Sequence, residues 1–155
     1  TGLFFEATAA GAITFANAYT FPTADGTAGQ VLTTNGAGQL SFASSGTGGW
    51  SVIGASQTLA VNTGYICTTG AALSLALPAT SAVGDTIEVA LDGSTSWTIT
   101  QPNAGTQIRI GSSETTLGVG GSLASTAVGD SIKLVCETAN ARWIVVSIVG
   151  NITVV

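Results

Sequence analysis

Apolar residues occur along this chain in short runs that alternate with polar positions, and small polar residues separate the runs. No apolar pattern with a helical period of about 3.6 residues persists, and the frequent glycines disfavour helices further. Short β-branched runs bounded by Gly, Asn, Asp and Ser are typical of strands. The pattern therefore predicts an all-β chain. We expect strands near residues 12–16, 30–34, 39–43, 50–53, 57–61, 64–68, 72–77, 85–91, 96–100, 107–110, 116–118, 122–125, 130–136 and 142–148.

The strongest local signal is Asn35-Gly36, which separates the run Gln30–Thr34 from the run Gln39–Phe42. Both residues tolerate the positive φ of a type I′ turn, so the pair predicts a tight β-hairpin. A two-stranded hairpin is marginally stable in water by itself, and this one offers few apolar side chains. We therefore expect another element, or another chain, to cover it.

A change in composition at residues 44–49, Ser-Ser-Gly-Thr-Gly-Gly, predicts a flexible linker. Residues 1–43 are rich in Gly, Ala and Thr, with single apolar residues at alternating positions, and are interpreted as a stalk or assembly segment. Residues 50–155 contain all three Trp and both Cys and are long enough to bury a core. They are interpreted as a C-terminal β head domain.

The head contains an internal duplication. Residues 79–89, Ala-Thr-Ser-Ala-Val-Gly-Asp-Thr-Ile-Glu-Val, match residues 124–134, Ala-Ser-Thr-Ala-Val-Gly-Asp-Ser-Ile-Lys-Leu, and each copy leads to a Trp that opens a strand. Val-Gly-Asp predicts a turn into a strand whose alternate residues face inward. We expect each such strand to pair with the Trp-led strand after it, and two such units suit a small antiparallel sandwich or barrel.

Charge excludes some classes of partner. With eight acidic and three basic residues the net charge is −5, so no basic footprint for nucleic acid exists. No apolar run approaches the ~20 residues of a membrane helix, and no basic, apolar leader begins the chain, so membrane insertion is not expected. Because Thr1 replaces the usual Met, we interpret the chain as a processed product or a piece of a longer polypeptide.

The chain contains no His, which removes the usual general base, the imidazole metal ligand and any Ser-His-Asp system. We therefore expect no catalytic residue, no cofactor and no metal site, and hence no enzyme. Cys67 and Cys136 cannot form a zinc site by themselves. Each ends an apolar run, so both are interpreted as buried free thiols, with a Cys67–Cys136 disulfide as the alternative.

Asp85 and Asp130 occupy equivalent places in the duplication. A carboxylate pair is a candidate for acid–base catalysis or calcium binding. However, Gly-Asp is typical of turns in which the Asp side chain accepts hydrogen bonds from nearby backbone N–H groups. Because equivalent positions in tandem units are separated by the fold whereas catalytic carboxylates must converge, we favour the turn.

Trp50, Trp97 and Trp143 are candidates for stacking against a sugar ring. A Trp that opens a strand is more often part of a core or an interface, where its large apolar area is buried. Trp97 is the best placed of the three for a ligand contact, because its neighbours are polar: Ser96, Thr98 and Gln101. The polar segments between strands predict further surface contacts in loops 92–96, 101–106 and 111–115.

Residues 12–42 resemble the repeat of tail-fibre and fibre-like proteins of tailed bacteriophages. The shared pattern is Phe-Pro-x-x-Asp-Gly-x-x-Gly-Gln-Val-Leu-x-Thr-Asn-Gly-x-Gly-x-Leu-x-Phe, and the match over residues 12–42 covers about a fifth of the chain. The head resembles more loosely the C-terminal modules that follow such repeats, at Gly64-Tyr65, Leu77-Pro78, Val83-Gly84-Asp85, Gly121-Ser122-Leu123 and Cys136. The resemblance implies a homotrimeric, mostly β fibre in a virion, whose surfaces contact a host cell.

We therefore expect a structural and adhesive module, the distal part of a homotrimeric tail fibre that attaches to a host-surface glycan or protein. One alternative is a subunit of a bacterial extracellular filament or surface layer, assembled by β-strand addition. A second alternative is a glycan-degrading spike, against which the absence of His and the small number of carboxylates argue.

Overall fold

The computed structural model describes residues 5–7, 13–15, 19–28, 30–44, 49–68, 70–93 and 95–155. The described residues contain strands and turns and no helix, which confirms the all-β prediction. In particular, no helix with the length and hydrophobicity needed to cross a membrane occurs among them. The chain divides into two compact units, residues 1–46 and 47–155, and the boundary falls within the segment predicted to be a linker.

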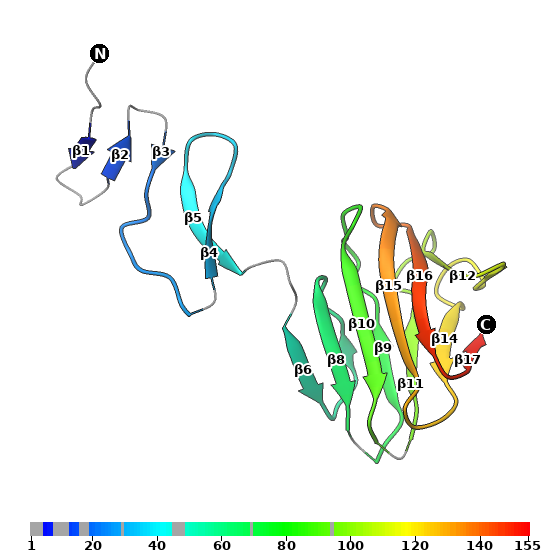
Figure 1. Ribbon diagram of the computed structural model, residues 1–155. Coiled ribbons are helices and arrows are strands. Elements are labelled where there is room, and N and C mark those ends of the chain that lie inside the picture. The colour runs from blue at the N-terminus through cyan, green and yellow to red at the C-terminus, as the bar shows by residue number, and fades with distance from the viewer. Residues whose placement is uncertain are drawn as a thin grey trace. The chain divides into compact units, whose positions relative to one another are not determined.

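Unit 1, residues 1–46, contains two small antiparallel sheets (Figure 1). The first has three strands, β1 (Phe5–Ala7), β2 (Ile13–Phe15) and β3 (Tyr19–Thr20). The second is the predicted hairpin, β4 (Gln30–Thr34) and β5 (Leu40–Ser44). The N–H of Thr20 donates to the carbonyl O of Gly38 over 2.8 Å, so β3 meets the loop of this hairpin.

The hairpin loop differs from the predicted type I′ turn. The strands pair as far as Thr34 and Leu40, and Gly36 and Gly38 have φ of 75° and 83°, whereas Asn35 has no positive φ. Instead, Asn35 Oδ1 accepts hydrogen bonds from the N–H groups of Ala37 at 2.8 Å and Gln39 at 3.1 Å. The Asn side chain therefore bridges a longer loop, and this local hydrogen bonding replaces the two-residue turn.

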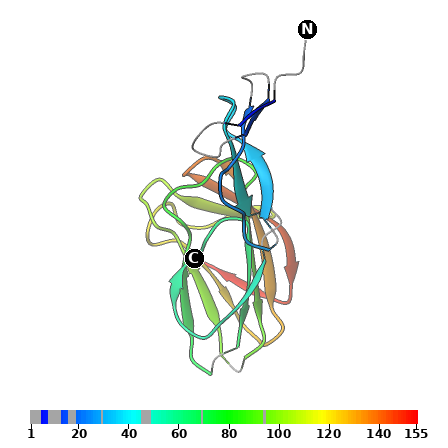
Figure 2. The same ribbon diagram turned by 90° about the vertical axis from the view of Figure 1, so that its left-hand side faces the viewer.

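Unit 2, residues 47–155, is a sandwich of two sheets (Figures 1 and 2). The seven-stranded sheet has the order β13 (Ser113–Glu114), β12 (Gln107–Ile110), β16 (Arg142–Val149), β15 (Ser131–Thr138), β10 (Thr86–Leu91), β8 (Thr63–Cys67) and β6 (Trp50–Ile53). The five-stranded sheet has the order β17 (Ile152–Val154), β14 (Ser122–Ser125), β11 (Trp97–Thr100), β9 (Leu73–Ala76) and β7 (Gln57–Thr58).

The prediction of an antiparallel sandwich is only partly right. From β6 to β11 successive strands alternate between the two sheets, and the neighbours within each sheet, β6-β8-β10 and β7-β9-β11, are parallel. The later strands add antiparallel ladders, β10 with β15, β15 with β16, and β11 with β14. In both parallel and antiparallel strands, every second residue faces the core. The alternating pattern therefore predicted where strands occur but not whether neighbouring strands are parallel or antiparallel.

The duplicated segments pair with each other. Strands β10 and β15 are antiparallel, and Glu88 lies opposite its own equivalent, Lys133. The turns before them follow the same local twofold symmetry, because Gly84 N–H donates to Cys136 O and Gly129 N–H donates to Leu91 O, both over 2.9 Å. The expected pairing with a following Trp-led strand is confirmed for β15 with β16 and is wrong for β10, because β11 lies in the other sheet.

Buried apolar side chains from both sheets form one core. They are Leu59, Tyr65, Cys67, Leu73, Leu75, Leu77, Ile87, Val89, Leu91, Trp97, Ile99, Ile108, Leu123, Ile132, Leu134, Cys136 and Trp143. The predicted inward positions of the duplication, Ile87/Val89 and Ile132/Leu134, are all among them. Every member belongs to unit 2, whereas none of the side chains described between residues 19 and 43 is buried.

Four observed strands were not predicted: β1, β3, β13 and β17. Each has two or three residues, too few to show an alternating pattern. Conversely, the strand predicted at residues 116–118 is a loop. It ends at Gly118, whose φ of 91° is incompatible with an extended strand.

Candidate functional site

Asp85 and Asp130 both lie in turns, as favoured from the sequence. Asp85 Oδ2 accepts a hydrogen bond from Ala82 N–H over 2.8 Å, and Asp130 Oδ2 accepts the equivalent bond from Ala127 N–H over 2.9 Å. The two turns lie at opposite ends of β10, because Asp130 O accepts from Leu91 N–H. Strand β10 separates them by about 20 Å, at ~3.3 Å per residue. This pair is too far apart for two carboxylates that act on one glycosidic bond.

Asp130 is also the most heavily bonded carboxylate described in the structure. Its Oδ2 accepts from Thr126 N–H at 2.7 Å and from the Thr126 hydroxyl at 3.2 Å. The backbone hydrogen bond from Thr126, helped by those from Ala127 and Asn151, lowers the pKa of Asp130 below its usual value despite burial. These bonds account for the carboxylate as a structural group.

The two cysteines are buried free thiols. Cys67 pairs with Leu91 at one end of β10, whereas Cys136 N–H donates to Asp85 O at the other end. The resulting separation of about 20 Å along the strand far exceeds the roughly 4–7 Å between Cα atoms in a disulfide. A disulfide within the chain is therefore excluded, and burial raises the pKa of Cys67 to about 11.

The preference for Trp97 as the ligand-contacting tryptophan is wrong. Trp97 is 0% exposed and Trp143 is 1% exposed, and both lie in the core between the sheets. Trp50, in contrast, is 54% exposed on β6, the edge strand of the seven-stranded sheet among the strands described. Of the polar neighbours of Trp97, Ser96 and Thr98 have the opposite orientation, since successive residues of a strand face opposite ways, and Gln101 is itself buried.

The indole of Trp50 lies flat over Gly64, its partner on β8. A methyl group at Gly64 would come within 2.6 Å of Cδ2, 2.7 Å of Cε3 and 2.9 Å of Cε2 of this indole. Because Cδ2 is an inner atom of the fused rings, a point this close to it lies over the face of the ring and not at its edge. Because Gly64 has no side chain, one face of the indole can pack directly on the sheet.

Polar groups lie beside this indole on the same face of the sheet. Gly64 is paired on its other side with Glu88, whose Oε1 lies 2.5 Å from Lys133 Nζ. A small hollow of about 50 Å³ is lined by Trp50, Asn62, Thr63, Gly64, Thr86 and Glu88. A larger one of about 210 Å³ is lined by Trp50, Glu88, Val89, Ala90, Ser131, Ile132, Lys133 and Ser147. Trp50 and Glu88 line both hollows.

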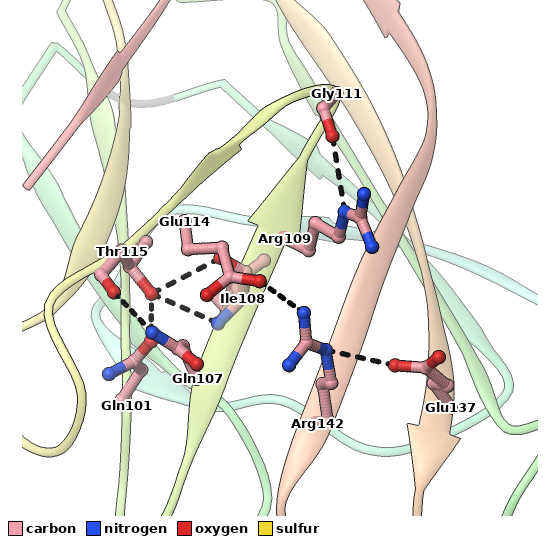
Figure 3. Close-up of polar contacts among 9 residues, drawn as sticks. All are labelled: Gln101, Gln107, Ile108, Arg109, Gly111, Glu114, Thr115, Glu137 and Arg142. Carbon is pink, nitrogen blue, oxygen red and sulfur yellow. Dashed lines mark hydrogen bonds and ion pairs between the residues drawn. The ribbon is translucent and has the colours of Figure 1, made fainter.

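The loops predicted to make surface contacts are partly occupied by internal bonds. Figure 3 shows Thr115 Oγ1 accepting from Ile108 N–H over 2.9 Å and donating to Gln101 Oε1 over 2.5 Å. Both Gln101 and Thr106, the ends of loop 101–106, are buried. Arg142 pairs with Glu114 and with Glu137 in the same region (Figure 3). Loop 92–96 includes residue 94, which lies outside the described residues.

The hairpin of unit 1 presents apolar side chains on both of its faces. Leu32 lies opposite Phe42 on one face, and Val31 lies on the other. Their exposed fractions are 44%, 37% and 43%, respectively. Residues 30–44 contain no charged side chain. The Phe42 ring touches Gly26, but this loop contact leaves much of the hairpin surface uncovered within the described part of the chain.

A comparison with known protein families and with characterised proteins found no match to this chain. Among the described residues, no three Cys, Asp or Glu side chains gather closely enough to hold a metal ion. Within the described part of the chain, two surfaces with binding character are the hairpin of unit 1 and the area around Trp50. The sequence indicated the first. It carried one signal for the second, Gly64 within a β-branched and aromatic run, where a strand glycine often marks a close approach.

Proposed function

We propose that this chain is a structural and adhesive module without enzymatic activity, the distal part of a homotrimeric fibre of a tailed bacteriophage. Residues 1–43 act as the stalk that assembles the chains, and residues 50–155 form the head that contacts a host surface. The proposal rests chiefly on the hairpin β4–β5, whose two faces expose Val31, Leu32 and Phe42.

A two-stranded ribbon with exposed apolar side chains needs a partner to be stable in water. The same hairpin from two other chains is a suitable partner, because its strands carry no charge that would repel its copies across a symmetry axis. The resemblance of residues 12–42 to phage fibre repeats supports the same arrangement. Three heads on one axis then raise avidity for a surface without any new contact.

The edge strand β6 favours a second candidate, a filament subunit. Strand β6 lies at the end of the ladder β6-β8-β10 and exposes 68% of Val52 in addition to Trp50. An extended segment of a neighbouring subunit can add to such an edge through main-chain hydrogen bonds. The two candidates differ in the product of assembly, which is a closed trimer in one case and an open polymer in the other.

The test is the mass of the full chain in solution, measured by sedimentation over a range of concentrations. The fibre proposal expects one species of three chains, and the double substitution Leu32→Ser with Phe42→Ser should release folded monomers. Thr34→Ser, at an exposed polar position of the same hairpin, is the matched control and should remain trimeric. Polymers that persist in the double variant would favour the filament, and a monomer at every concentration would overturn both.

A further inference from the structure

We propose that Trp50 and Glu88 form a binding site for one neutral pyranose ring of a surface glycan. This proposal deepens the proposed function, on which it rests, by naming the class of ligand that the head binds. The site is the outer face of the Trp50 indole together with the two hollows beside it. Its residues come from strands β6, β8, β10, β15 and β16 and, for Asn62, from the turn before β8.

The first requirement of such a site is a fixed apolar surface. The C–H groups of a pyranose form an apolar patch that packs against the face of an aromatic ring. Trp50 offers such a face, since one side of its indole is held against Gly64 and the side chain remains 54% exposed. An indole already held in place loses little conformational freedom on binding, which favours affinity.

The second requirement is a set of polar groups at the edge of that surface, because the hydroxyls of a sugar need hydrogen-bond partners. An ionised carboxylate accepts bonds at both oxygens, and Lys133 contacts Oε1 of Glu88. The ion pair therefore positions an acceptor next to the indole. Ser131, Lys133 and Ser147 add hydroxyl and ammonium groups around the hollow of about 210 Å³. This volume is far larger than the roughly 10–15 Å³ that a cavity needs, in the same measure, to hold one water.

The charges around the site favour a neutral sugar over an acidic one. Lys133 is paired with Glu88, and Asn62, which lines the smaller hollow, donates its Nδ2 to Asp85. The described cations Arg109 and Arg142 line neither hollow. No unpaired cation in the described residues around the site would offset the negative charge of a sialic or uronic acid.

The test uses the full chain with glucose, galactose, mannose and N-acetylglucosamine as probes, and with iodide quenching of tryptophan fluorescence as the readout. Because Trp97 and Trp143 are buried, iodide reports on Trp50. At least one of the four sugars should protect Trp50 from iodide in a saturable manner. Trp50→Ala, followed by calorimetry with that sugar, should weaken binding at least about tenfold, the ratio that corresponds to ~1.4 kcal/mol.

Two further variants show whether sugar binding depends on the position of the indole or only on an intact edge strand. Gly64→Ala keeps every ligand group but displaces the ring, since its methyl group would meet the indole at 2.6 Å, and it should also weaken binding. Val52→Ser, an exposed position on the same strand and the same face, should leave binding unchanged. Sugar binding that survives Trp50→Ala would overturn the proposal, as would the absence of protection by all four sugars.

A Trp50 that iodide cannot reach in the full chain would also overturn the proposal, because another copy or another part of the chain would then cover the indole. Sedimentation of the same samples measures the oligomeric state, so a failure of the sugar site can be distinguished from a failure of the proposed function. A trimer that binds no sugar would contradict only the sugar-site proposal, whereas a monomer that binds sugar would contradict only the fibre proposal.

Discussion

Asp130 shows how one side chain can organise a turn between the two sheets. Its carboxylate accepts from backbone N–H groups and the Thr126 hydroxyl, while that hydroxyl contacts Asn151 O at 2.8 Å. Gly150 lies against the other carboxylate oxygen, since a methyl group at this position would lie 1.8 Å from Asp130 Oδ1. The turn therefore joins the start of β15 to the segment between β16 and β17 through one anionic group.

We expect this group to contribute stability that depends on pH. Hydrogen bonds to the charged form lower the pKa of Asp130 in the folded state. The contribution is therefore complete above the unfolded pKa of about 4 and is lost as pH falls through the lower folded pKa. Urea unfolding between about pH 2 and pH 7 should show this loss, and Asp130→Asn should be less stable near pH 7 and flatter in acid.

Asp92→Asn is the control for this pH dependence, since Asp92 is an exposed acidic residue that follows Leu91, whose backbone bonds the Asp130 turn. It should follow the parent protein through the acid range. An Asp130→Asn variant with an unchanged acid profile would show that the turn does not depend on the carboxylate charge.

The thiols give a second prediction at this scale. Burial raises the pKa of Cys67 to about 11, so the reactive thiolate is scarce near pH 8. Both thiols are buried, and we expect neither to react with a disulfide reagent in the folded chain. In denaturant without reductant, both should react. A protein with no titratable thiol after unfolding would contradict the separation of Cys67 from Cys136 along β10.

At single residues, the hydrogen bonding of the Asp side chains in turns was predictable from the sequence, whereas the solvent exposure of the Trp side chains was not. Val-Gly-Asp identified both turns because the Asp side chain bonds backbone groups only three or four residues away. Trp50 and Trp97 both open strands, and nothing near them in the sequence shows which strand lies at a sheet edge. That difference depends on pairing between distant segments.

At the scale of elements, the local twofold symmetry of β10 and β15 explains one divergence between the duplicated segments. Equivalent residues meet at the centre of the ladder, so an identical charge at that position would face itself. The chain has Glu88 in one copy and Lys133 in the other, and the two form an ion pair. Like charges opposite each other would destabilise the ladder.

This symmetry predicts that the two charges can be exchanged. Glu88→Lys or Lys133→Glu alone places like charges opposite each other and should lower stability by roughly 0.2–1 kcal/mol, the range of partly exposed pairs. The double substitution restores an opposite pair in a nearly equivalent setting and should recover most of the loss. Urea unfolding of the four proteins measures this cycle. A double variant less stable than either single one would show that the two environments are not equivalent.

Most strand positions were predictable because alternation and turn residues are local features of the sequence. The direction of the strands was not predictable in the same way. Whether a chain returns beside the strand it has left or crosses to the facing sheet depends on the connection. The segment between β6 and β7, for example, crosses to the other sheet, although its residues read like an ordinary turn.

At the scale of the whole molecule, stability is concentrated in one unit. Among the side chains that the structure describes, all members of the buried core belong to residues 47–155, and that unit includes both sheets of the sandwich. We therefore expect residues 47–155 to fold alone, with a urea midpoint close to that of unit 2 in the full chain. The midpoint can be followed by the fluorescence of the buried Trp97 and Trp143.

A matched control for this truncation is Leu134→Ala in the same fragment, which opens a cavity in the core. It should cost about 2–5 kcal/mol, as for other buried Leu residues. A fragment that is already unfolded before this substitution would show that residues 1–46 supply part of the fold of unit 2.

Strand β6 is also the place where a pull on the chain reaches unit 2, since it is the first strand after the unit boundary. Among the described strands it is held by the ladder to β8 alone. Under tension from the N-terminal side, an edge strand peels from its neighbour before the strands behind it separate. We expect such peeling to lift the Trp50 indole from Gly64, so that the most exposed aromatic side chain described in the head responds first to mechanical force.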